Sequence, residues 1–65
     1  MATDPDKLEA DAVDEAFHGE LGKLFEVLCD EMSAGVPQAH QHYGDKRELL
    51  RRARRSALAM IGTQF

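Results

Sequence analysis

Apolar side chains recur every three or four positions through the first half of the chain, which is the spacing of an amphipathic α-helix. Thr3 or Asp4 can cap this helix, and Pro5 suits its first turn, where an N–H would have no partner. Gly35 and Pro37 then stop it. The pattern predicts one helix over about residues 5–33. At 100° per residue its stripe spans about 100° and consists of Val13, Phe17, Leu21, Leu24, Leu28 and Met32.

Gly19 and Gly22 interrupt this pattern, and each costs roughly 1 kcal/mol relative to alanine inside a helix. The apolar stripe nevertheless keeps its phase across both glycines, which favours one continuous helix. A break near His18–Gly19, which would give three helices in all, is the alternative that the sequence leaves open.

A second helix is predicted over about residues 46–62, after a connector at 34–44. Asp45 and Glu48 form a D-x-x-E variant of the capping box, and Gly62 can end the helix. Its apolar stripe is formed by Leu49, Leu50, Ala53, Ala57, Met60 and Ile61. The alanines in the middle of this stripe allow another helix to approach closely.

Together these elements predict an all-α fold, a helical hairpin that forms a single small domain over residues 1–65. A chain this short buries only about 60% of the surface that its unfolded form exposes. Small domains compensate with disulfides, metals or oligomerisation, and the single cysteine, Cys29, excludes an internal disulfide. We therefore expect two hairpins to pair as a dimeric four-helix bundle. The expected self-association residues are Phe17, Leu21, Leu24, Leu28, Ala53, Ala57 and Ile61.

Charge is strongly segregated along the chain. Residues 1–35 carry ten acids and two bases, whereas residues 36–65 carry six bases and two acids. The two halves can pair with each other, or the basic half can bind a polyanion. The basic residues Arg47, Arg51, Arg54 and Arg55 share a face opposite the alanine stripe, where they could contact phosphates. The acidic first helix is a second charged surface, suited to a basic protein groove.

The residues typical of enzymes and metal sites are sparse. His40 and His42 form an H-x-H pair without a second pair, and Glu15 and His18 form a single E-x-x-H whose glutamate points away from the apolar stripe. Cys29 is expected to be a small buried hydrophobe rather than a nucleophile. We therefore expect no catalytic residues, no metal and no cofactor.

One local pattern resembles a known family. Ala34-Gly35-Val36 followed by Tyr43-Gly44-Asp45-Lys46 and Leu49-Leu50 resembles the recognition-helix exit of TetR-type repressors. That resemblance implies a helix-turn-helix with Tyr43 and Lys46 near phosphates. It covers about seventeen residues, its inner spacing is about two residues short, and the preceding helix-turn pattern is missing. It does not identify the chain as a member of that family.

These observations predict a small non-enzymatic protein-interaction module, a regulator, adaptor or inhibitor that acts as a helical homodimer and binds a further protein partner. The lone cysteine, the acidic N-terminus and the lack of a long apolar run predict a cytoplasmic location without a membrane segment. The alternative is a nucleic-acid-binding regulator that uses the basic face of the second helix.

Overall fold

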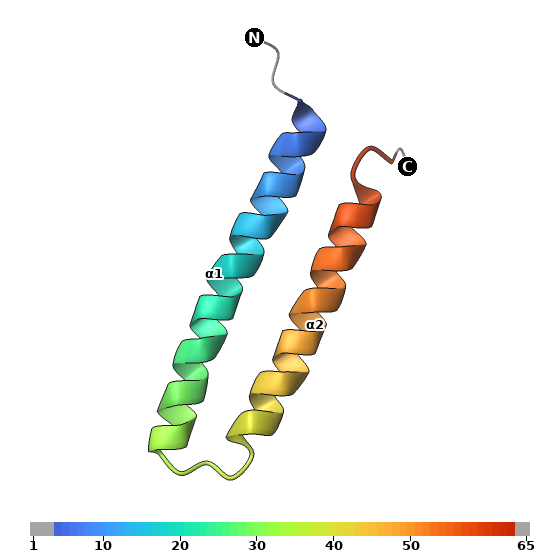
Figure 1. Ribbon diagram of the computed structural model, residues 1–65. Coiled ribbons are helices and arrows are strands. Elements are labelled where there is room, and N and C mark those ends of the chain that lie inside the picture. Colours follow the sequence, from blue (N-terminus) through green and yellow to red (C-terminus); the bar gives the residue numbers. More distant parts are fainter. Residues whose placement is uncertain (1–3, 64–65) are drawn as a thin grey trace.

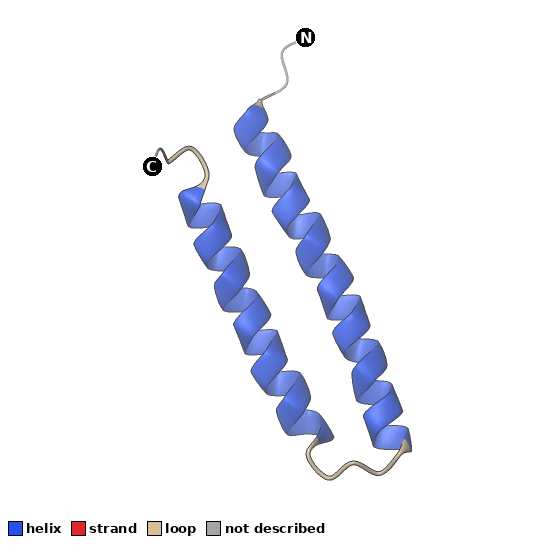
Figure 2. Ribbon diagram, turned by 180° about the vertical axis from the view of Figure 1, so that it is seen from behind, coloured by secondary structure: helices blue, strands red, loops and turns tan. Residues whose placement is uncertain are grey.

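Two antiparallel helices joined by a short connector form the hairpin (Figure 1). The computed structural model describes residues 4–63, with helix α1 at Pro5–Ser33 and helix α2 at Ala39–Met60. Within these residues there is no strand (Figure 2). The predicted all-α hairpin is therefore confirmed, while its assembly into a four-helix bundle stays a prediction.

Helix α1 has the ends that its sequence predicts. The Asp4 carboxylate accepts a hydrogen bond from the backbone N–H of Asp6 at 3.0 Å, and Pro5 lies in the first turn. The helix continues unbroken through both of its glycines, so the three-helix alternative is wrong.

The C-terminus of α1 closes in a Schellman motif. The N–H of Val36 donates to the carbonyl of Glu31 at 2.9 Å, and the N–H of Gly35 donates to the carbonyl of Met32 at 3.1 Å. Gly35 has a φ of +73°, a left-handed conformation that glycine adopts without a Cβ clash. This motif turns the chain back toward α1.

Helix α2 begins at Ala39 rather than near residue 46, so the predicted connector at 34–44 is too long. Asp45 is not a cap but lies inside the helix, one residue after Gly44. The early start has a packing reason, because Ala39 and Tyr43 continue the helical side on which Leu50 lies. Ala39 is thereby buried to 3% exposure against the closed end of the hairpin.

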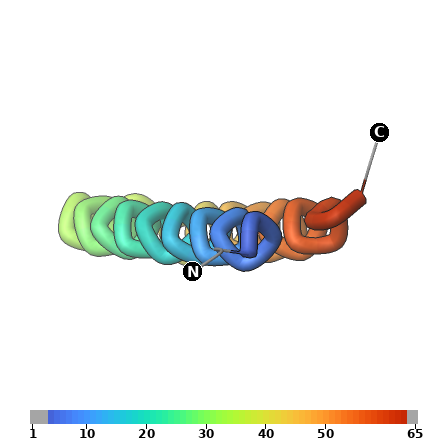
Figure 3. The backbone as a smooth tube through the Cα atoms, turned by 90° about the horizontal axis from the view of Figure 1, so that it is seen from above, coloured from blue at the N-terminus to red at the C-terminus, as the bar shows by residue number. Residues whose placement is uncertain are grey.

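The hairpin is a single layer of helices, as the view along it from above shows (Figure 3). Its extents are 51 × 25 × 11 Å, so it is only as thick as one helix. Half-buried side chains line the seam between the helices, but Ala39 is the one fully buried residue among residues 4–63. The seam is formed by Val13, Phe17, Leu21, Leu24 and Leu28 from α1, and by Ala39, Tyr43, Leu50, Ala57 and Ile61 from the second half.

This thin shape leaves much surface uncovered. The chain exposes 5310 Å², whereas a compact monomer of its mass, 7.2 kDa, exposes about 4,100 Å². The radius of gyration is 15.6 Å, against about 11 Å for a compact domain of this length. The hairpin is therefore much more extended than a compact domain of the same length.

Candidate interaction surfaces

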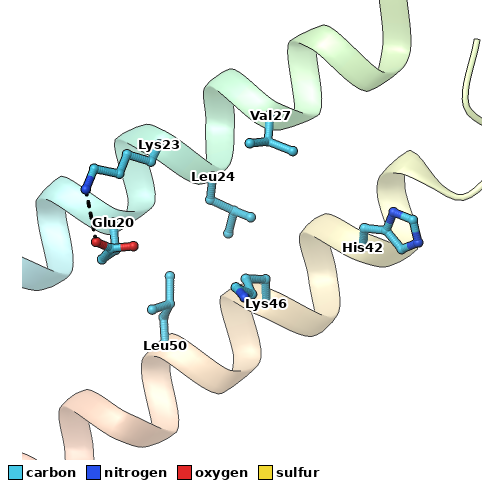
Figure 4. Close-up of a pocket in the computed structure, with 7 residues that line it drawn as sticks. All are labelled: Glu20, Lys23, Leu24, Val27, His42, Lys46 and Leu50. Atoms are coloured by element: carbon cyan, nitrogen blue, oxygen red, sulfur yellow. Dashed lines mark hydrogen bonds and ion pairs between the residues drawn. The ribbon is translucent and has the colours of Figure 1, made fainter. Parts of the chain in front are cut away.

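An apolar groove runs along one face of the hairpin. In its first part Leu24 of α1 faces Leu50 of α2, and Val27 lies farther along α1, across from the stretch between Lys46 and His42 (Figure 4). This hollow has a volume of about 350 Å³. Its rim is polar and is formed by Glu20, Lys23, His42 and Lys46.

A second hollow continues the groove toward the open end of the hairpin. The two hollows share Glu20 and Leu50, so they form one continuous surface. The second hollow is lined almost wholly by apolar atoms, from Val13, Ala16, Phe17, Ala53 and Ala57, with Arg54 at its edge. We call this combined surface the groove.

The seven predicted self-association residues divide between the groove and the seam. Phe17, Leu24, Ala53 and Ala57 line the groove. The other three, Leu21, Leu28 and Ile61, are half-buried in the seam. All seven therefore lie in the groove or in the seam, and their role in pairing two copies stays a prediction.

Large apolar side chains are exposed on both faces. Val27 of α1, which lines the groove, is 48% exposed. On α2, the exposed Leu49 and Met60 lie on the same side of the helix as Ala53. Phe25 is 58% exposed and lies two positions from Val27, about 200° around the helix. Exposed apolar side chains are therefore not confined to the groove face.

Arg54 lies at the seam rather than on an outward basic face. Its Nε donates to Oδ1 of Asp14 at 2.7 Å, which joins the two helices. Its guanidinium carbon also lies 5.5 Å from the centre of the Phe17 ring. Arg54 therefore lies beside Arg51 and Arg55 on α2, but its guanidinium is held by an acid on α1, as a pairing of the acidic and basic halves would place it. Nucleic-acid contact by these arginines stays a prediction.

We expect the Asp14–Arg54 pair to contribute little to stability, because each side chain is 41% exposed. A double-mutant cycle with Asp14→Asn and Arg54→Gln should give a coupling energy of about 0.5 kcal/mol. Urea unfolding followed by circular dichroism measures it at low and high salt. A coupling above about 2 kcal/mol would show that the pair is far less hydrated than this geometry implies.

The remaining arginines lie on the face opposite the groove. Arg51 and Arg55 are exposed, and within residues 4–63 neither forms an ion pair. They border a hollow of about 360 Å³ that we call the arginine pocket, lined by Phe17, Arg51, Arg54, Arg55 and Leu58. Arg47 stands apart, with its guanidinium carbon 5.7 Å from the centre of the Tyr43 ring.

The other polar candidates do not gather. Across residues 4–63 no three histidine, cysteine or acidic side chains form a group that could hold a metal ion. His42 Nδ1 lies 3.0 Å from Oε2 of Glu31, whereas His40 points to solvent. Cys29 is exposed, so the expectation of a buried thiol is wrong.

Within the described part of the chain, neither helix has the length and apolar character needed to cross a membrane.

Sequence reasoning missed three of these features. Ala39 and Tyr43, four residues apart, do extend the α2 stripe toward its N-terminus, but the capping signal at Asp45 hid that extension. The Glu31–His42 and Asp14–Arg54 pairs depend on how the helices align, and no local pattern encodes their partners.

The described geometry also bears on the TetR-type pattern. Tyr43, Gly44 and Lys46 lie in one uninterrupted helix, so no helix ends near Gly44, as the exit of a recognition helix would require. No family model, curated protein or solved structure matches the chain.

Proposed function

We propose that this chain is a small non-enzymatic protein-interaction module that acts in the cytoplasm as a helical homodimer. One observation carries the proposal: among residues 4–63, Ala39 is the single fully buried residue, and the other apolar side chains there are half-buried or exposed. Such a core is too thin for a stable monomer.

Pairing two hairpins groove to groove supplies the missing core. Leu24, Val27 and Leu50 of each copy would be covered by the other copy, giving a four-helix bundle. Ala53 and Ala57 add little bulk, so the second layer of helices can approach to the usual 8–10 Å.

The available area suits such a dimer. The hairpin exposes 5310 Å², roughly 1,200 Å² more than a compact chain of its mass. Burying a comparable area on each of two copies reaches the roughly 1,600 Å² of a standard protein interface. The rim of the groove carries both charge signs, from Glu20, Lys23 and Lys46. A two-fold axis can place unlike charges opposite each other there.

Light scattering coupled to size-exclusion chromatography tests the proposal. The expected mass is twice the 7.2 kDa of one chain and changes little with salt, because apolar contacts dominate the groove. The melting temperature should also rise with protein concentration, since association stabilises the fold. A monomer with a sharp, concentration-independent melt would contradict the proposal.

Nucleic-acid binding is the second candidate function, favoured by the exposed guanidinium groups of Arg47, Arg51 and Arg55 on α2. Adding a generic DNA duplex to the same chromatographic run tests it. Co-elution that disappears at high salt would support this candidate.

A further inference from the structure

The arginine pocket combines positive charge with an apolar floor. Arg51 and Arg55 stand at its border, while Phe17 and Leu58 line it. We propose that this pocket binds an acidic amphipathic helix of a partner protein. Carboxylates of the ligand pair with Arg51 and Arg55, and one apolar side chain enters the hollow. The proposal deepens the interaction-module function but uses the face opposite the groove.

The spacing of the two arginines matches a helical ligand. Arg51 and Arg55 are one helical turn apart, which places their side chains about 6 Å apart along α2. Two glutamates at i and i+4 on a ligand helix have the same spacing. Each guanidinium presents a planar fork of donors that fits a carboxylate with two parallel hydrogen bonds.

Arg54 lines the pocket, but its charge is already paired with an acid of α1. Asp14 already accepts its hydrogen bond at 2.7 Å, and its guanidinium lies over the Phe17 ring. Both contacts bias the Arg54 side chain toward one position before a ligand arrives, which slightly lowers the ordering cost of binding.

The same surroundings favour a short acidic peptide over nucleic acid. A duplex lying on the pocket would extend past it onto α1, where exposed acidic side chains such as Asp11 and Glu15 repel phosphates. Arg54 lies over the one aromatic ring of the pocket, so a base cannot stack on that side of it. A peptide needs only two carboxylates and one apolar anchor.

The test is a fluorescence anisotropy titration of the full chain with a synthetic helical peptide. The peptide carries glutamates four residues apart and a leucine on the same face. We expect Arg51→Glu combined with Arg55→Glu to weaken binding by roughly tenfold or more. Arg52→Glu is the matched control, because Arg52 is an exposed arginine of α2 outside the pocket. It should change affinity by less than about twofold.

Replacing the peptide leucine with serine should weaken binding by about tenfold, because the apolar anchor is lost. Equal effects of the Arg52 variant and the pocket variants, or equal binding of both peptides, would overturn the proposal. Binding of a generic DNA duplex instead of the peptide, lost in the pocket variants, would overturn it in favour of a phosphate ligand.

Helix content and mass are recorded for every variant in these titrations. A variant that keeps both and loses the peptide has lost the pocket and not the fold. A monomeric chain that still binds the peptide through its arginines contradicts the homodimer alone. A dimer that ignores the peptide contradicts the pocket alone.

Discussion

Val27→Asp is expected to convert the proposed homodimer into monomers. Val27 lines the groove and is 48% exposed in one hairpin, so its side chain becomes buried only when a second copy covers it. An aspartate there would place an unpaired charge in the interface, once from each copy, and its short side chain cannot extend to solvent. The dissociation constant should rise at least about a hundredfold, roughly 3 kcal/mol.

Phe25→Asp is the matched control for this variant. Phe25 lies on the same helix, is 58% exposed, and points away from the groove. The substitution places the same charged residue, with the same helix propensity, on α1. It should nevertheless leave the dissociation constant within about threefold of that of the unmodified chain. Sedimentation equilibrium over a range of concentrations measures both variants. A monomer from Phe25→Asp and a dimer from Val27→Asp would place the interface on the opposite face.

The second large effect is a gain in stability. Gly19 and Gly22 lie inside α1, and a Cβ added at either position meets nothing within 4 Å. Replacing both with alanine should therefore stabilise the fold by roughly 2 kcal/mol, because alanine loses less backbone freedom in a helix. For a domain of this size, that corresponds to an increase in melting temperature of about 10 °C.

Gly35→Ala is the matched control, a glycine-to-alanine change that is expected to lower stability. Gly35 has a φ of +73° in the turn after α1, so alanine there should destabilise the fold by about 1 kcal/mol. Thermal and urea unfolding of the single and double variants, at one protein concentration, checks these values. A loss of stability from Gly19→Ala or Gly22→Ala would show that a second chain approaches α1 closely at that glycine.

The sequence was sufficient to predict α1 because local signals agree there. Asp4 and Pro5 mark the start of this helix and Gly35 marks its end, while the apolar stripe between them keeps its phase. The two internal glycines reduce helix stability too little to break the helix. The fold class and the loop end of α1 therefore follow from local chemistry.

The start of α2 could not be predicted from the local sequence, because packing overrode the capping signal. Asp45 looks like a cap, but an earlier start buries Ala39 against α1 and adds Tyr43 to the seam. Local helix signals are weak preferences, and tertiary contacts routinely decide where a helix begins and ends.

The arginine surface was predicted only in part for a related reason. Spacing along α2 groups Arg51 with Arg55, which the structure places together. Spacing cannot show that Asp14, forty positions from Arg54 in the chain, captures that side chain. A partner on the other helix is set by how the two helices align, which no single-helix pattern contains.

The order of cross-helix contacts along the hairpin has a consequence for how the chain folds. Glu31 and His42, near the turn, are 11 positions apart, whereas Asp14 and Arg54 are 40 apart. Closing a short loop costs less entropy than closing a long one, so the contacts beside the Schellman turn form first. Each contact that forms shortens the loop that the following contact must close. Cross-helix contacts therefore form in order from the turn toward the open end of the hairpin. Its last turns are the first to fray.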